Sequence, residues 1–214
     1  MRVDNTVYFA PGIEYKQMDW SDPEALISPF RMRVWGFYLK PARYFVDLWN
    51  RLSRRLNADK SKLSGLAFGC GVISSTAIDF LAGIEYFPSK DVGDRYKKWL
   101  NNRLSLFYIP DPQNQNHLVS ARFYYEFRNG LVHEGRIKNA GQFSFDPDLF
   151  TTNSLFEIIG DALVVNPANL LDSIANALDN YLSEISSDTP RLNKFGNTLN
   201  AYFSDDINYV KMHG

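Results

Sequence analysis

The segment from Phe68 to Tyr86 constrains the fold most, because it is rich in small residues and almost wholly apolar. Its interior carries one charged side chain, Asp79, before Glu85 near its end. A helix that is apolar nearly all round is usually buried. We therefore predict a central helix in close contact with its neighbours. Asp79 is either a supporting residue of a site or a buried carboxylate bonded to a neighbouring helix end.

Apolar residues at spacings of three and four predict helices over most of the chain. The clearest stripe lies in a helix that Pro41 starts or kinks, and consists of Phe45, Leu48, Trp49, Leu52 and Leu56. Further helices are predicted to begin at Asp22–Pro23 with a break at Pro29, at Asp91 or Asp94, after Asn166–Pro167 and at Thr189–Pro190. Residues 110–116 are predicted to be a polar connection.

Short strands are predicted between the later helices. Gln142–Asp146 alternates, and Phe156–Ile159 and Ala162–Val165 flank the turn signal Gly160–Asp161. We expect a small β-hairpin insert at about residues 141–166. The predicted fold class is therefore mainly α.

Composition favours one domain with appendages, because 214 residues with 45% hydrophobic content can bury a sizeable core. Cys70 is the only cysteine, which excludes a disulfide within the chain and suits a reducing cytoplasm. The start lacks an apolar signal core, and the longest uncharged run, residues 63–78, is rich in Gly and Ser. We expect a cytoplasmic protein without a membrane span. Metal-ligand spacings and a phosphate-binding glycine loop are missing, so no metal or cofactor is expected.

The run from Phe123 to Gly135 pairs a permanent cation, Arg128, with a titratable imidazole, His133. A metal-free ribonuclease needs two such groups, one to move protons near neutral pH and one to hold the charge that builds on phosphorus. On a straight helix Arg128 falls in an apolar stripe, where a charge needs a partner or a wet cleft. A polar seam runs beside it and consists of Arg122, Glu126, Asn129 and His133.

A structural interpretation of the same run stays open. Gly135 is a typical helix C-cap, and the helix dipole favours a histidine in the last turn whatever its chemistry. The seam is then a solvated face, and Arg128 and His133 form an interhelix hydrogen-bond pair.

Gly130 lowers helix propensity by about 1 kcal/mol, and we expect it to bend the helix and turn His133 toward Arg128.

The string from the aromatic approach through Arg128–Asn129 to Val132–His133 and a closing glycine resembles the signature of HEPN (higher eukaryote and prokaryote nucleotide-binding) domains. The order of helices over residues 41–140 is also similar to that of bacterial HEPN-like proteins. This resemblance implies an antiparallel bundle of about four to five helices that forms a homodimer. The expected organisation is an N-terminal extension (1–40), the bundle (41–140), the β-hairpin insert (141–166) and C-terminal helices packed on the bundle (167–214).

The resemblance further implies metal-independent RNA cleavage by the RNA's own 2′-hydroxyl, as in bacterial proteins of a toxin or defence type. His133 would be the general base or acid, Arg128 would neutralise the phosphorane oxygens, and Asn129 would orient the imidazole or bind a phosphate oxygen. Asp79 and Glu126 are candidate supporting residues. The competing interpretation is a non-catalytic dimeric module that binds nucleotide or protein. Candidate partners are RNA, a second copy, and an antitoxin or a nucleotidyltransferase.

Charge is unevenly distributed although the net charge is −1. Residues 31–62 carry nine basic and two acidic side chains, residues 85–138 nine and six, and residues 139–214 three and ten. Such asymmetry permits a local phosphate-binding surface, although solvated helix faces would look the same. The candidate RNA-binding residues are Arg54, Arg55, Lys97, Lys98, Arg122 and Arg136.

Overall fold

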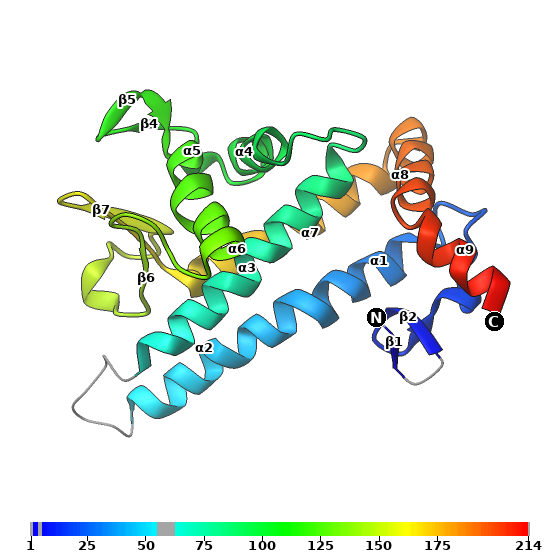
Figure 1. Ribbon diagram of the computed structural model, residues 1–214, viewed down its shortest axis with the longest axis horizontal. Helices are drawn as coiled ribbons and strands as arrows, with labels where there is room; N and C mark the ends of the chain where they lie inside the picture. Colours follow the sequence, from blue (N-terminus) through cyan, green and yellow to red (C-terminus); the bar gives the residue numbers. More distant parts are fainter. Residues whose placement is uncertain (1, 4–5, 55–62, 214) are drawn as a thin grey trace.

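The computed structural model describes residues 2–3, 6–54 and 63–213, and this part of the chain is mainly helical, as predicted (Figure 1). α2 (Lys40–Ser53) and α3 (Ser64–Glu85) lie side by side. α4 (Val92–Arg103) and α7 (Pro167–Ser186) also contact α3. α3 is therefore the central helix that the sequence predicts.

Small residues of α3 allow its close contacts. A Cβ added at Gly71 would lie 2.2 Å from the ring of Phe143, and one at Gly69 would lie 2.9 Å from the ring of Phe45. Among the described residues, α3 is also the one helix long and apolar enough to cross a membrane, but 67% of its most apolar window is buried inside the protein. Such burial is typical of a core helix.

The helix before α3 is longer than predicted, because α1 (Ile27–Val34), a π-helical turn η2 (Trp35–Leu39) and α2 follow one another without a break. The predicted start at Asp22–Pro23 is wrong: Asp22 accepts a hydrogen bond from the Glu24 N–H (2.9 Å), and this turn precedes the helix. Pro29 lies in the first turn of α1, where proline is tolerated, and causes no break. The wide turn η2 lies just before Pro41, which has no N–H for α-helical bonding.

Three small sheets accompany the helices. The predicted hairpin is confirmed: β7 (Phe156–Ile159) pairs antiparallel with β8 (Ala162–Val165) around Gly160 at φ +62°, and β6 (Gln142–Phe143) pairs parallel with β8. Residues 110–118 form a second hairpin, β4 (Pro110–Asp111) and β5 (Asn114–Leu118), where the sequence predicts only a connection. The N-terminal sheet was also not predicted, and contains β1 (Arg2–Val3), β2 (Thr6–Ala10) and β3 (Ile13–Glu14).

The C-terminal helices meet the N-terminal strands (Figure 1). The predicted last helix is divided into α8 (Thr189–Tyr202) and α9 (Ser204–His213). Tyr15 donates a hydrogen bond to Asp206 in α9 (2.7 Å). The remaining elements are the 3-10 turns η1 (Tyr15–Gln17), η4 (Ser105–Phe107) and η6 (Pro147–Leu149), the short helices α5 (Val119–Phe123) and α6 (Gly130–Glu134), and the π-helical turn η5 (Tyr124–Asn129).

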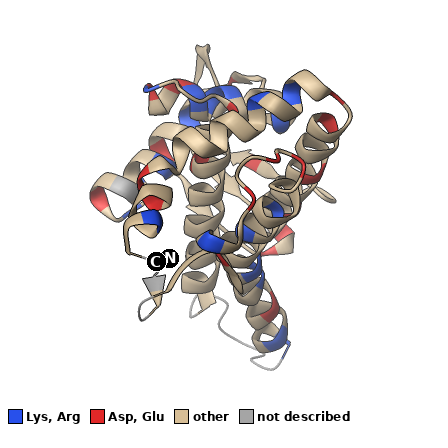
Figure 2. Cartoon of the chain, turned by 90° about the vertical axis from the view of Figure 1, so that its right-hand side faces the viewer, with Lys and Arg blue, Asp and Glu red and all other residues tan. Residues whose placement is uncertain are grey.

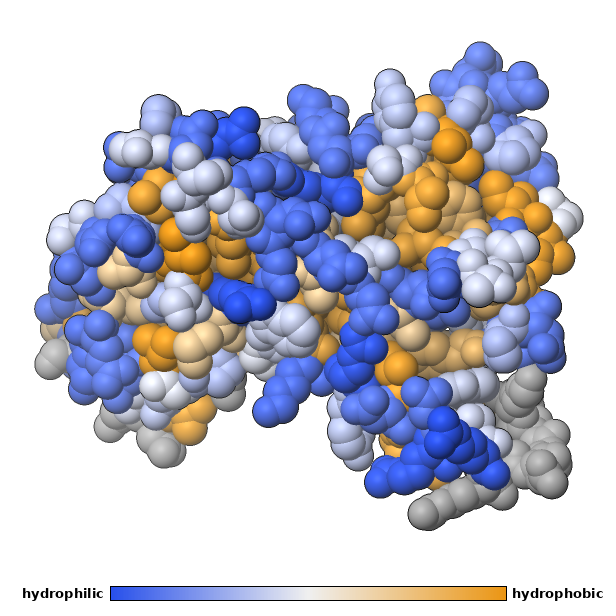
Figure 3. All heavy atoms as spheres, turned by 180° about the vertical axis from the view of Figure 1, so that it is seen from behind, coloured by the Kyte–Doolittle hydropathy of each residue, from blue (hydrophilic) through white to orange (hydrophobic). Residues whose placement is uncertain are grey.

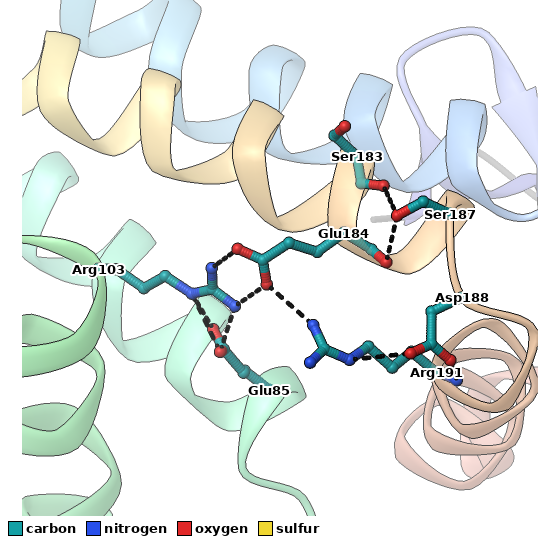
Figure 4. Close-up of polar contacts among 7 residues, drawn as sticks. All are labelled: Glu85, Arg103, Ser183, Glu184, Ser187, Asp188 and Arg191. Carbon is teal, nitrogen blue, oxygen red and sulfur yellow. Dashed lines mark hydrogen bonds and ion pairs between the residues drawn. The ribbon is translucent and has the colours of Figure 1, made fainter.

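One arginine joins three helices (Figure 4). Arg103 at the end of α4 donates to both carboxylate oxygens of Glu85 in α3 (2.7–3.1 Å) and to both oxygens of Glu184 in α7 (2.6 and 3.0 Å). Its guanidinium also lies 5.1 Å from the ring centroid of Tyr181. The hydrogen bonds from Arg103 lower the pKa of Glu184. A lowered carboxyl pKa contributes stability at neutral pH that is lost as the pH falls through the folded-state pKa.

We predict that Arg103→Met lowers the free energy of unfolding at pH 7 by about 3 kcal/mol, because it leaves two glutamates without their shared cation. The difference from the wild type should shrink below a pH of about 4, where carboxylates become protonated. Urea unfolding at several pH values measures both effects. Arg191→Met, which removes an exposed arginine from the same network, is the matched control and should cost less than about 1 kcal/mol. Equal losses for the two variants at pH 7 would contradict this account.

Candidate functional site

The motif lies on one continuous helical stretch made of α5, η5 and α6. Phe123 and Phe127 are fully buried and stack with ring centroids 4.7 Å apart, so that face belongs to the core. The stretch ends at Gly135, whose φ of +65° is the left-handed conformation of a glycine cap. The predicted C-cap is therefore confirmed.

The middle turn of this stretch is π-helical and contains both Arg128 and Asn129. A π turn inserts an extra residue and shifts the following side chains around the helix axis, and such turns are frequent at functional sites. The predicted polar seam is accordingly divided. Glu126 is buried and Asn129 is half-buried, whereas His133 is exposed.

Arg128 is held by the central helix. Its Nε and Nη2 donate to Oδ2 of Asp79 at 3.3 and 2.8 Å, and Nη2 of Arg95 lies 3.7 Å from Oδ1 of the same carboxylate. The side chains of Arg128 and Asp79 are 11% and 24% exposed. Both line a small cavity of about 50 Å³ together with Ser75 and Thr76. Asp79 is thus the partner that an arginine in an apolar stripe requires.

His133 lies on the last turn of α6, and among the described residues no hydrogen bond or ion pair joins its imidazole to Arg128 or to another side chain. Gly130 has a different role from the predicted bend toward Arg128. A Cβ at Gly130 would lie 2.4 Å from the backbone carbonyl oxygen of Arg136. The glycine therefore lets the segment after Gly135 fold back against the helix, where the Arg136 N–H donates to the Gly130 carbonyl at 3.3 Å.

Arg122 and Glu126 belong to a second buried ion cluster. Nε of Arg122 donates to Oε1 of Glu126 at 3.0 Å, and its Nη1 lies 3.4 Å from Oδ1 of Asp111. Its Nη2 also donates to the carbonyl oxygen of Asp161. The Arg122 side chain is only 9% exposed. Burial raises the pKa of Glu126, although Arg122 opposes this effect.

An open cavity of about 820 Å³ lies over this cluster. Its lining includes Asp111, His117, Tyr124 and Tyr125, none of which the sequence marks as site residues. Asp111 and His117 lie on the β4–β5 hairpin, which carries no helical spacing relative to the motif. Sequence reasoning missed the turn of this hairpin, and that turn is the signal that could have located both residues.

The candidate RNA-binding residues are dispersed. Arg54 is exposed at the end of α2, and Arg55 lies outside the described residues. Lys97 lines the 820 Å³ cavity, whereas Lys98 and Arg136 form ion pairs with Asp94 (3.0 Å) and Glu134 (2.7 Å). Figure 2 shows basic and acidic residues interspersed over the helices, and Figure 3 shows apolar surface patches separated by hydrophilic ones. The candidates within the described residues do not lie on one basic face.

Comparisons of this chain with known proteins do not show which family it belongs to. No protein-family model, no curated protein and no solved structure matches the chain. Among the described residues, no three His, Cys, Asp or Glu side chains lie close enough together to hold a metal ion. The resemblance to HEPN domains therefore rests on the motif and the order of the helices.

We predict that Asp79→Asn lowers the free energy of unfolding by about 2 kcal/mol, because Arg128 and Arg95 lose their carboxylate in a mostly buried setting. Asp94→Asn is the matched control, since the half-exposed carboxylate of Asp94 pairs with Lys98 on the surface of α4. It should cost less than about 1 kcal/mol. Chemical denaturation of both variants measures the difference, and an equally small effect at Asp79 would show that its ion pair contributes little.

Proposed function

We propose that this protein is a metal-independent endoribonuclease of HEPN type. The observation that carries the proposal is the contrast between the polar residues of the motif that have internal partners and the one that is exposed. Arg122, Glu126 and Arg128 all have internal partners, whereas His133 is exposed on the same helical stretch. An exposed imidazole can reach an RNA strand, and histidine is the side chain best suited to proton transfer near neutral pH.

Under this proposal, Asp79 holds the guanidinium of Arg128 in position before a phosphate binds. The bonds to Asp79 use Nε and Nη2, so the described contacts of Arg128 leave Nη1 to donate to a phosphate oxygen. A cation fixed before the substrate arrives needs no reorganisation as charge develops on phosphorus. Asn129, half-buried beside Arg128, would supply a further amide donor to phosphate.

The proposed reaction forms one bond to phosphorus and breaks another. One imidazole removes the proton of the 2′-hydroxyl, and the 2′-oxygen attacks the adjacent phosphorus. The bond from phosphorus to the 5′-oxygen then breaks, and a second, protonated imidazole gives its proton to the leaving oxygen. The products are a 2′,3′-cyclic phosphate and a 5′-hydroxyl. Because the chain has a single motif histidine, we propose that a homodimer supplies the second imidazole as His133 of a second copy.

A non-catalytic dimeric module is the second candidate function. The bond between Arg128 and Asp79 favours it, because an ion pair between two helices is also what a purely structural arginine forms. In that case the surface around His133 would bind a nucleotide or a protein partner such as an antitoxin or a nucleotidyltransferase. RNA cleavage assays separate the two functions.

We predict that the purified protein cleaves single-stranded RNA in the presence of a chelator, and that His133→Ala lowers the rate by at least about 100-fold. Arg128→Lys should lower it by about tenfold or more, because a lysine ammonium cannot hold Asp79 through two nitrogens and present a third to the phosphate. His213→Ala is the matched control, since this exposed histidine of α9 contacts Tyr209, through its carbonyl oxygen and its ring, and lies outside the motif, so the variant should cleave at the wild-type rate.

Analysis of the RNA ends tests the chemistry, and sedimentation equilibrium tests the homodimer. Cleavage that persists in His133→Ala would remove this residue from the mechanism. A folded protein that stays monomeric at micromolar concentrations and still cleaves RNA would contradict a site shared by two copies.

A further inference from the structure

Tyr125 is an exposed aromatic residue of the motif stretch that the proposed reaction does not use. It belongs to the π-helical turn η5, which also contains Asn129, and it is 50% exposed. Its neighbour Tyr124 is half-buried and packs against the core. A single exposed tyrosine is common on a protein surface, so the position of Tyr125 relative to His133 decides what it can do.

The π turn brings Tyr125 and His133 toward one face of the helical stretch. Eight residues separate them, and on a regular α-helix this spacing turns two side chains about 80° apart. Because the π turn adds one residue, the spacing corresponds to seven regular positions, and the two side chains are then only about 20° apart. Asn129 lies between them. Their accessibility agrees, since Tyr125 and His133 are exposed and Asn129 is half-buried. We call these three residues the exposed ridge.

The ring of Tyr125 is supported by a fixed cation. The ammonium group of Lys138 lies 4.9 Å from the ring centroid and also pairs with Glu134 at 2.6 Å. The Lys138 side chain is only 16% exposed. Gly130 makes room for it, because a Cβ at Gly130 would lie 3.0 Å from Cγ of the lysine. A ring that is held before a ligand arrives loses little freedom on binding.

Tyr125 also borders the open cavity of about 820 Å³ beside the β4–β5 hairpin, so part of the side chain faces space that a ligand can enter. The lining has three carboxylates and two permanent cations, namely Asp111, Glu126, Asp161, Lys97 and Arg122. Such a lining does not favour a phosphate group, whereas a neutral flat group meets no net repulsion there. The bases of single-stranded RNA are neutral and flat, and they stack on exposed aromatic side chains.

We infer that Tyr125 is a stacking platform for an unpaired base of the RNA strand that is cleaved at His133. The base rests on the ring at the edge of the cavity, and the sugar–phosphate backbone follows the exposed ridge past Asn129 to His133. One helical turn, about 5 Å along the axis, separates Tyr125 from Asn129, which a single nucleotide can span. Because every base has a flat face, the contact carries little sequence preference. The inference rests on the proposed function for the identity of the strand as RNA.

Binding of a strand that cannot be cleaved tests the platform apart from the chemistry. A short, single-stranded oligoadenylate with 2′-O-methyl groups serves as the probe, because its 2′-oxygens cannot attack phosphorus. Fluorescence anisotropy should show that Tyr125→Leu weakens binding by about tenfold, whereas Tyr125→Phe stays within about twofold of the wild type. Tyr44→Leu, which changes an exposed tyrosine of α2, is the matched control and should bind as the wild type does.

Two further measurements distinguish lost stacking from lost charge or a disturbed fold. Stacking releases no counterions, so the dependence of affinity on salt should have the same slope in Tyr125→Leu and in the wild type. A strand of the same length without bases should bind the two proteins equally and should bind the wild type more weakly than the oligoadenylate does. This comparison of strands on the wild type needs no variant.

Unchanged oligoadenylate affinity in Tyr125→Leu, or an equal loss of affinity for the strand without bases, would overturn the inference. Sedimentation that shows a lost dimer in Tyr125→Leu would also overturn it and assign Tyr125 to a contact between copies. Binding that depends on Tyr125 and on the bases, without cleavage of native RNA, would reject only the ribonuclease. Cleavage of native RNA by a protein whose binding does not depend on Tyr125 would reject only the platform.

Discussion

The burial of α3 is the constraint on which the rest of this structure depends. Its small side chains let α2, α4 and α7 approach closely, and this packing leaves the interior carboxylate of Asp79 little contact with water. Arg128 and Arg95 come from two other elements and meet that carboxylate. One acidic residue thereby fixes the position of η5 and α4 against the central helix.

This ion pair also determines what the motif can do. The cluster at Asp79 holds Arg128, and the second buried cluster holds Arg122 and Glu126, so the π-helical turn is fixed on both sides. His133 comes one turn later and is exposed. The proposed ribonuclease uses this division of roles, because a fixed cation and an accessible imidazole are different requirements of the same reaction.

Patterns among neighbouring residues predicted much of the fold. They could not predict contacts between residues that are far apart in the sequence. The stripe of α7 and its cap at Asn166, and the hairpin turn at Gly160, follow from neighbouring residues. The strands β1 and β3 have two residues each, too few for a periodic pattern. Asp79 and Arg128 were both singled out, but they are 49 residues apart, and nothing local shows that they form a pair.

A double-mutant cycle on Asp79 and Arg128 tests the central claim most directly. The free energy of unfolding is measured for the wild type, Asp79→Asn, Arg128→Met and the double variant. If this pair joins η5 to the central helix, the second substitution should cost much less once the first is present, with a coupling energy of about 2 kcal/mol. Losses that add to within about 0.5 kcal/mol would contradict the claim and show that the two residues stabilise the protein independently.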